Sequence, residues 1–519
     1  QAKRCFLEEL GGLDNLTSQL CIYGLDGVNN KDEAKKARLD NKSHISSLKF
    51  SWALAIGDND VYNDEDVLEG LKPHSNIERL LIENYKGKRF ASWMMIVNPS
   101  LSILRNLVVL ELLNCDECEC LPALGHLSFL EELNIRDLKS VERFGMEFYG
   151  STDNYNHMNL DSTSSGCVVF PSLRKLYIIN LVKLEKWVEG VERNAWSSEV
   201  VNNFPCLEVL WIKRCPMLKR VPSHFPSLQE LCIEEVGVEQ WWCDCASLRR
   251  LEIRNCSESM KLNSRVNVNV SGCDSTALMK APFHFLEKIT LVKVVGLPEM
   301  LSSNITCLVE LELVGIRGCG IQSVLDELLG NCRLLTGVTL EGCLEVRKLN
   351  WGINLADGGS SSSVAMTVLF PCLKKLSLKQ LPKLEEWVGL DIFPSLKSLE
   401  IGGCPMLKRV PTHFPSLSTL DVWGMNEALW LEMMSSNVTS LTGLSLREVG
   451  GPEIEHVVER LLRNNTCLQS LKVRNCSELR HLPMDCLQSS TSLQQLDIFE
   501  CPALHAVPYL QGLTNLSFL

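Results

Sequence analysis

No stretch of this 519-residue sequence contains the roughly 18 consecutive apolar residues that a membrane-spanning helix requires. The first residues, Gln1-Ala-Lys-Arg-Cys-Phe, also lack the apolar core of a secretory signal peptide. Positive charge is in deficit: 51 lysines and arginines stand against 63 aspartates and glutamates, a net charge of -12. We therefore expect no membrane span, and no broad electrostatic binding to nucleic acid or anionic lipid.

The signatures of common catalytic sites are missing as well. There is no Gly-x-x-x-x-Gly-Lys-Ser/Thr phosphate loop, no His-Glu-x-x-His zinc motif and no Gly-x-Ser-x-Gly nucleophile elbow. We predict that this chain is not an enzyme and that it holds no cofactor and no metal. It lacks an initiator methionine and stops within a repeat at Leu519, so we expect it to be a fragment of a longer protein.

Repetition is what the sequence has in abundance. The phrase Cys-Pro-Met-Leu-Lys-Arg-Val-Pro occurs at Cys215–Pro222 and again, unchanged, at Cys404–Pro411. Upstream, Phe170-Pro-Ser-Leu-Arg-Lys-Leu parallels Phe370-Pro-Cys-Leu-Lys-Lys-Leu. A chain that copies itself in blocks is a repeat protein, and its repeat unit determines its fold.

The repeat unit within these blocks is Leu-x-x-Leu-x-Leu/Ile-x-x-Cys/Leu/Val, the leucine-rich repeat signature. Clear copies start at Leu107, Leu207, Leu248, Leu396, Leu468 and Leu493. Less regular copies start near Leu16, Ile45, Ile77, Leu130, Leu173, Leu228, Leu286, Leu308, Leu335, Leu373, Leu417 and Leu441. These are 18 units, and a clipped one follows at Leu516.

The alternation in Leu-x-Leu predicts a short strand with aliphatic side chains on one face and variable ones on the other. One coil cannot bury its apolar face alone, whereas stacked coils share a continuous core. We therefore predict an α/β solenoid over residues 1–519: an irregular horseshoe with a parallel sheet on its concave face and loops or short helices on its convex face. A helix is expected at Asp32–Leu39, where acidic residues precede basic ones. Uneven repeat spacing predicts polar excursions at Ser151–Gly166 and Asp357–Ser363.

The sequence contains 23 cysteines, of which seven occupy the position where a strand turns into the following loop. They are Cys115, Cys215, Cys256, Cys343, Cys404, Cys476 and Cys501. A thiol there packs as a small apolar group that donates weakly to a carbonyl. A disulfide between Cys476 and Cys501 on successive coils is geometrically allowed, but scattered unpaired thiols favour a reducing compartment. Zinc at Cys115–Cys120 or at Cys243/Cys245 is the alternative, and neither has a second pair at finger spacing.

The variable positions of the strands form the candidate binding surface. Aromatic and basic residues, which protein interfaces favour, gather there. We predict a partner-binding set of Tyr177, Trp211, Lys213, Arg254, Trp423, Arg447 and Phe499. The alternative is that these rings merely lean on neighbouring coils.

Several blocks resemble a known family. Leu7-Glu-Glu-Leu-Gly-Gly-Leu, Leu20-Cys-Ile-Tyr-Gly-Leu and Glu33-Ala-Lys-Lys-Ala-Arg-Leu are similar to the start of the leucine-rich repeat region in plant coiled-coil nucleotide-binding disease resistance proteins. Leu121-Pro-Ala-Leu-Gly-His-Leu and the Leu-x-x-Trp pairs at Leu184/Trp187 and Leu384/Trp387 are similarly characteristic. The resemblance covers essentially the whole chain.

The resemblance implies a cytoplasmic or nuclear immune receptor in which the repeats sense a pathogen effector or a guarded host protein and restrain a nucleotide switch. ATP or ADP would bind only in the nucleotide-binding domain, which this chain lacks, and oligomerisation would use absent domains too. We expect residues 1–150 to face that domain and the duplicated residues 151–519 to carry recognition. The competing hypothesis is a non-immune repeat adaptor, such as a ubiquitin-ligase substrate receptor.

Overall fold

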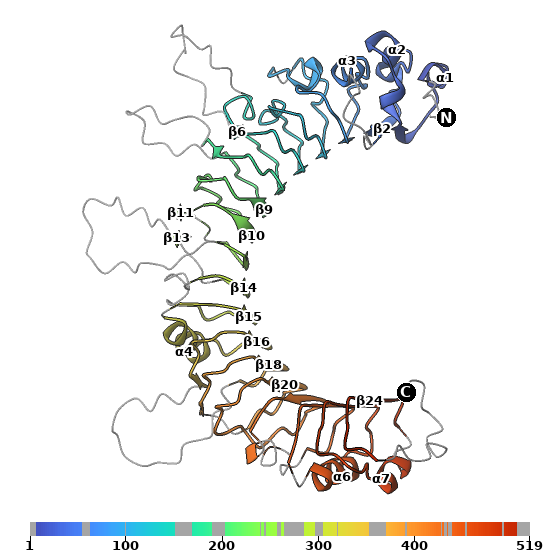
Figure 1. The fold of residues 1–519 in the computed structure, drawn as a ribbon. Helices are drawn as coiled ribbons and strands as arrows, with labels where there is room; N and C mark the ends of the chain where they lie inside the picture. Colours follow the sequence, from blue (N-terminus) through green and yellow to red (C-terminus); the bar gives the residue numbers. More distant parts are fainter. Residues whose placement is uncertain are drawn as a thin grey trace, which may run out of the picture. The chain divides into compact units, whose positions relative to one another are not determined.

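The protein folds into stacked coils that form two compact units, Gln1–Phe283 and His284–Leu519 (Figure 1). The computed structural model describes residues 7–53, 63–98, 100–150, 169–188, 203–238, 240–242, 245, 247–256, 261–263, 285–295, 305–318, 320–351, 370–389, 392–426, 428–429, 433, 438–451, 454–489 and 492–505. The two predicted polar excursions and the clipped unit at Leu516 lie outside these residues.

Each unit is built on a ladder of parallel strands and contains half of the 18 main strands. The ladder of the first unit runs through β1 (Ser18–Tyr23), β2 (Ile45–Ser51), β3 (Arg79–Glu83), β4 (Val109–Leu113), β5 (Glu132–Arg136), β7 (Lys175–Ile179), β9 (Val209–Cys215), β10 (Glu230–Val236) and β12 (Arg250–Arg254). The ladder of the second runs through β14 (Lys288–Val292), β15 (Glu310–Val314), β16 (Gly337–Glu341), β18 (Lys375–Lys379), β20 (Ser398–Gly402), β21 (Thr419–Trp423), β22 (Gly443–Arg447), β23 (Ser470–Arg474) and β24 (Gln495–Phe499).

The predicted solenoid fold is confirmed, and each predicted repeat start precedes or opens one of these strands. The first repeat is irregular, because its Leu-x-x-Leu spacing from Leu16 to Leu20 contains one extra residue. The pairing of β1 with β2 shifts there, between Ser18 and Gln19. From Gln19 onwards the ladder is in register, so the aliphatic positions of successive strands face one another.

Aliphatic side chains fill the interior of every coil because the second and fourth residues of a typical five-residue strand point inwards. Leu210 and Ile212 of β9, and their counterparts Leu399 and Ile401 of β20, are at most 1% exposed. Burying each such side chain contributes on the order of 1.5–3 kcal/mol. A coil gains this contribution only when neighbours cover both of its faces.

The repeated Phe-Pro-x-Leu phrase builds a second line of contacts between coils. Phe204 stacks on Phe170 of the preceding coil, with ring centroids 5.2 Å apart and an interplanar angle of 11°. Phe225 continues the line 5.6 Å from Phe204, and Phe414 repeats it beside Phe393 in the second unit. Serines of this phrase also connect coils, because their hydroxyls donate to a backbone carbonyl of the coil before. Ser227, Ser395 and Ser416 donate to the carbonyls of Pro205, Pro371 and Pro394, and Ser172 donates to that of Ser128. Ser247, which lies outside a Phe-Pro phrase, makes the same bond to Pro226.

The cysteines at the strand ends behave as predicted. Cys115, Cys215, Cys256, Cys343, Cys404 and Cys476 are buried, whereas Cys501 is half-buried. Each donates to the carbonyl two residues earlier, as Cys215 does to Lys213 over 3.4 Å. Burial raises the pKa of the Cys215 thiol to about 12, so this thiol is protonated and unreactive at neutral pH. Cys476 and Cys501 are both free, while Cys245 is disulfide-bonded.

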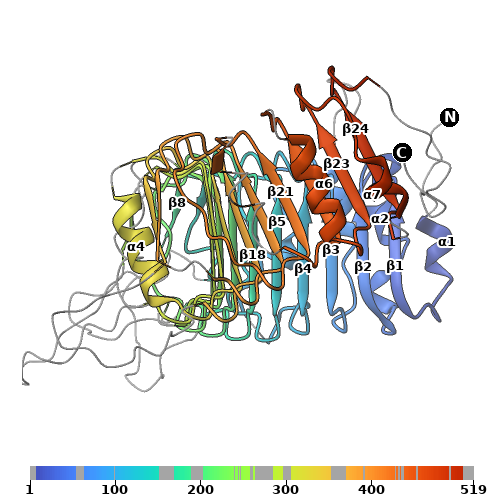
Figure 2. The same cartoon turned by 90° about the horizontal axis from the view of Figure 1, so that it is seen from below.

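Helices and short strands occupy the side of the coils away from the ladder. The helices are α1 (Leu7–Gly11), α2 (Lys31–Lys35), α3 (Asp64–Gly70), α4 (Ile321–Asn331), α6 (Ile454–Asn464) and α7 (Met484–Ser489), with single 3-10 turns η1 (Leu25–Gly27), η2 (Leu39–Asn41) and η3 (Ser92–Met94). The short strands are β6 (Arg143–Phe144), β8 (Lys186–Trp187), β11 (Gln240–Trp242), β13 (Lys261–Asn263), β17 (Lys348–Asn350) and β19 (Glu386–Val388). Figure 2 shows α6 and α7 next to each other in the second unit.

The predicted helix at Asp32–Leu39 exists but is shorter. In α2 the Asn30 side chain caps the helix by accepting from the Glu33 amide, and regular α-helix ends at Lys35. Arg38 then takes a left-handed conformation with φ of 49° and starts the 3-10 turn η2. The prediction of the last four residues as α-helix was therefore wrong, because the chain must turn there towards β2.

His126 is expected to make the stability of the first unit depend on pH. Its imidazole is partly buried, and among the described residues neither ring nitrogen has a hydrogen-bond partner. Burial lowers the pKa of His126 below its ordinary value near 6.5. The unfolded chain therefore takes up a proton near pH 6.5 while the folded chain stays neutral to lower pH, so stability falls as the pH drops below about 6.5.

We expect urea unfolding of the first unit to require less denaturant at pH 5.5 than at pH 7.5, and His126→Leu to reduce that difference. His44→Leu removes an exposed imidazole and serves as the control. An unchanged pH dependence in His126→Leu would show that other groups are responsible.

Candidate protein-interaction surface

The alternate side chains of the ladder strands, those not pointing into the coils, form what we call the open face of each unit. It corresponds to the concave face of the sequence prediction. In a typical five-residue strand the first, third and fifth residues lie on it, as Val209, Trp211 and Lys213 do in β9. Because the strands pair in register, residues at the same strand position form rows across neighbouring coils.

In the first unit, two aromatic rings meet in the central row. Tyr177 of β7 and Trp211 of β9 are paired across the ladder, and their rings make an edge-to-face contact with centroids 5.2 Å apart. The Trp211 indole nitrogen donates to Glu230 Oε1 at 2.9 Å, and Lys213 Nζ lies 4.4 Å from the indole centroid. The indole is thus fixed from its edge and from its face, which lowers the entropy that a partner must remove on binding.

The basic residues around this pair are largely compensated by acidic neighbours. Lys213 pairs with Glu234 at 3.6 Å, and Arg254 Nε donates to Glu252. Arg174 and Lys175 pair with Glu208 and Glu132. The region is therefore a pair of aromatic rings surrounded by ion pairs, and not a free positive patch. An apolar centre with a polar rim is the usual anatomy of a protein interface.

In the second unit, Trp423 and Arg447 are cross-strand neighbours in the fifth-residue row. The Arg447 guanidinium lies over the indole, 4.4 Å from its centroid. Asp421 holds that guanidinium in place through two hydrogen bonds of 3.3 and 2.5 Å. On the other side the indole covers Gly402, where a Cβ would stand 1.9 Å from the ring atoms. Only glycine fits beneath the ring, so Gly402, Trp423 and Arg447 form one ordered stack.

The same row continues through Arg474 of β23 to Phe499 of β24. Arg474 is held by Asp497 as Arg447 is held by Asp421, and its Nε is buried without a partner among the described residues. Phe499 is 56% exposed. We call Trp423, Arg447, Arg474 and Phe499 the cation–aromatic row.

The structure thus divides the predicted set between the two units. Tyr177, Trp211 and Lys213 come together in the first, with Arg254 further along the ladder on β12. Trp423, Arg447 and Phe499 share the row of the second. Sequence reasoning missed Arg474 and the three residues that order the row, Gly402, Asp421 and Asp497. Their strand positions carried the signal, because residues at equal positions of consecutive repeats must be neighbours.

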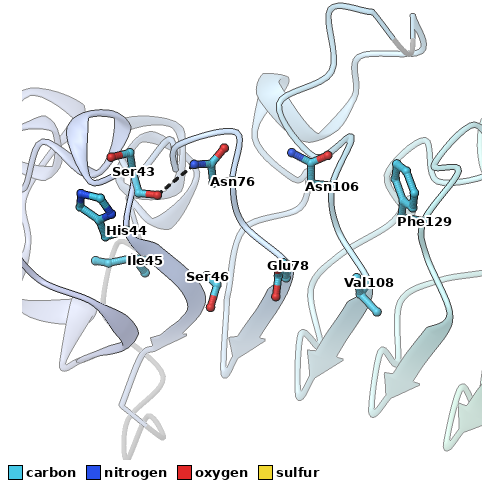
Figure 3. A pocket seen from close by; sticks show the side chains of 9 residues that line it. All are labelled: Ser43, His44, Ile45, Ser46, Asn76, Glu78, Asn106, Val108 and Phe129. Atoms are coloured by element: carbon cyan, nitrogen blue, oxygen red, sulfur yellow. Dashed lines mark hydrogen bonds between the residues drawn. The ribbon is translucent and has the colours of Figure 1, made fainter.

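A groove of about 460 Å³ lies near the start of strands β2 to β4 in the first unit (Figure 3). Asn76 and Asn106 line it, but their amides donate to the backbone carbonyls of Ser43 and Ser75 and so connect coils. Glu78 and the 60% exposed ring of Phe129 remain to contact a partner. None of the predicted site residues lies in this groove.

Among the residues that the structure describes, no group of three or more His, Cys, Asp and Glu side chains is arranged to hold a metal ion. Of the zinc alternative, Cys115 donates to the Leu113 carbonyl and Cys118 to the Gly87 carbonyl, and Cys243 lies outside the described residues. In the described part of the chain, no helix is long and apolar enough to cross a membrane.

Comparison with known proteins places the repeats in context. Residues 7–138 match the family model of R13L1/DRL21 leucine-rich repeats. An RPP13-like disease resistance protein of Arabidopsis thaliana is 33% identical over 241 residues, which are 45% of this chain and 21% of that protein. Disease resistance protein RGA2 of Solanum bulbocastanum is 32% identical over 267 residues, 49% of this chain and 24% of that protein. An internalin structure from Listeria monocytogenes matches 94% of this chain and 88% of its own at 12% identity, with a TM-score of 0.25.

The predicted resemblance to the leucine-rich repeat region of plant disease resistance proteins is confirmed by these matches. The chain spans at most 24% of the length of these two relatives.

Proposed function

We propose that this leucine-rich repeat region, similar to those of plant disease resistance proteins, senses a pathogen effector or a guarded host protein on its open faces. In this proposal the chain binds and does not catalyse, works in the cytoplasm or nucleus, and restrains a nucleotide switch in a domain outside this chain. A bound effector would release that switch by binding the active arrangement more tightly than the resting one.

The observation that supports recognition most strongly is the ordered cation–aromatic row. Trp423 lies between Gly402 and a guanidinium that Asp421 anchors by two hydrogen bonds. Trp and Arg are the residues most enriched among the few that dominate binding energy, and side chains that are already ordered lose little entropy on binding.

The N-terminal repeats and the remaining repeats would have different functions. Residues 151–519 contain both aromatic clusters of the open faces, and we assign recognition to them. Residues 1–150 contain the groove beside Phe129, and we assign to them the contact with the nucleotide-binding domain. The competing function, a non-immune repeat adaptor, would use the same open faces for a constitutive host partner.

The test is Trp211→Ala and Trp423→Ala in the intact receptor, assayed with the effector that activates it. Whichever of these two tryptophans contacts the effector, we expect its replacement to weaken effector binding by about 2 kcal/mol, roughly thirty-fold. The same variant should reduce cell death in leaves. Leu334→Ala removes a 51% exposed side chain outside the predicted site and is the control.

Arg447→Ala should cost about as much as Trp423→Ala, and the double variant clearly less than the sum, because the two side chains form one stack. Unchanged binding and unchanged cell death in both tryptophan variants would refute the assignment of recognition to these rows. Equal binding of the same host protein with and without infection would favour the adaptor instead.

A further inference from the structure

The duplicated phrase Cys-Pro-Met-Leu-Lys-Arg-Val-Pro presents the same surface in both units. In each copy the phrase begins at or just after the end of a ladder strand. Its cysteine, leucine and second proline are buried, and its first proline, methionine, lysine and arginine are exposed. Met217 is 43% exposed and Met406 is 49% exposed. A large apolar side chain therefore stands in solvent at the same place in both copies.

The coil before each phrase is duplicated too and extends this surface. Lys219 of the first copy donates its backbone amide to the carbonyl of Glu185 at 3.1 Å, and Lys408 of the second donates to Glu385 at the same distance. Lys408 Nζ also pairs with the Glu385 carboxylate at 2.8 Å. We call the two surfaces the turn patches. The first consists of Lys183, Glu185, Met217, Lys219 and Arg220, and the second of Lys383, Glu385, Met406, Lys408 and Arg409.

The ladder strands at the start of the two copies, β9 and β20, share their buried residues but differ in their open-face residues. Their buried residues are equivalent, with Leu210 and Ile212 matching Leu399 and Ile401. Their open-face residues all differ: Val209, Trp211 and Lys213 in β9 correspond to Ser398, Glu400 and Gly402 in β20. If the two copies were alike only because they arose by duplication, their exposed positions in strand and phrase should have diverged equally. The requirements of core packing explain only why the buried positions stayed the same. Neither accounts for an exposed methionine, lysine and arginine that stayed the same.

We propose that the turn patches are two equivalent docking sites for one kind of partner, an acidic protein segment that carries an apolar side chain. In the first patch three cations stand against one anion, Glu185. In the second, Lys383 also pairs with Glu345 at 2.8 Å and Lys408 also faces Glu386, while Arg347 lies beside Glu345, so four cations stand against three anions. Both patches are therefore net positive, the first more strongly, in a chain whose net charge is -12. Methionine is a flexible, polarizable side chain that adapts to apolar partners. This surface is separate from the open faces, so it provides a contact beyond the proposed recognition function.

The test uses the full chain and a random peptide library displayed on phage. We expect selection to enrich peptides with acidic residues beside Leu, Phe or Met, and calorimetric titration of a synthesised winner to give two peptides per chain. Replacing one patch by Met217→Ser, Lys219→Glu and Arg220→Glu should leave one binding site. The corresponding change at Met406, Lys408 and Arg409 should also leave one, and both together none.

Two controls separate this result from other causes. Lys72→Glu with Arg333→Glu makes the same change in charge as one patch variant, at exposed positions elsewhere, and should keep two sites. Trp211→Ala with Trp423→Ala should also keep two sites, because the open faces are not involved. Enrichment of peptides without acidic residues, a stoichiometry other than two, or patch variants that still bind two peptides would overturn the proposal.

Discussion

Replacing Phe204 by alanine is expected to lower the free energy of unfolding of the surrounding coils by about 3–5 kcal/mol. The ring is fully buried and contacts Phe170 at 5.2 Å, Phe225 at 5.6 Å and Trp187 at 5.9 Å, measured between centroids. Its removal leaves a cavity shared by three coils. In a solenoid each coil is stabilised chiefly by its neighbours, so the loss should spread along the stack from this point.

Hydrogen exchange of the backbone amides in β7, β9 and β10 provides the measurement, because it reports local opening in place of global unfolding. Phe129→Ala is the matched control, since that ring is 60% exposed and its loss should change stability by no more than about 0.5 kcal/mol. If both variants exchanged at the rate of the parent chain, the line of stacked rings would have no structural importance.

The ladder could be predicted from the sequence because the aliphatic period determines both the strand and its inward face. Each of the 18 full predicted repeats corresponds to one strand, even at β1, where an extra residue interrupts the frame. The helices were harder to predict, since they replace loops of variable length. Yet α6 carried a readable signal: Ile454, Val457, Val458, Leu461 and Leu462 follow helical spacing, and all five are buried.

Which residues of the candidate surface are neighbours was predictable, but their side-chain contacts were not. Trp423 and Arg447 occupy equal positions of consecutive repeats, so their contact follows from register alone. The anchoring of Arg447 by Asp421 depends on side-chain geometry, which the repeat pattern does not specify. The same holds for the ion pairs that compensate Lys213 and Arg254 in the first unit.

Asn465→Leu is expected to destabilise the second unit by about 3 kcal/mol, because it would leave several buried backbone groups without partners. Asn465 is 2% exposed and directly follows α6. Its Oδ1 accepts from the Leu441 amide at 2.8 Å, and its Nδ2 donates to the carbonyls of Val438 and Leu461 at 2.9 Å each. Leucine has a similar volume, so the loss would come from these hydrogen bonds and not from a cavity.

The helix α4 offers a natural comparison for this position. There the residue after the helix is Cys332, whose thiol donates to the Ile305 carbonyl of the preceding coil at 3.1 Å. Asn465→Cys should therefore keep one of the bonds and lose less stability than Asn465→Leu, as measured by urea unfolding. Asn464→Leu changes the exposed neighbour and should stay within about 0.5 kcal/mol of the parent chain. Equal losses in the leucine and cysteine variants would mean that the side chain acts through packing, and that polar bonds to the preceding coil contribute little.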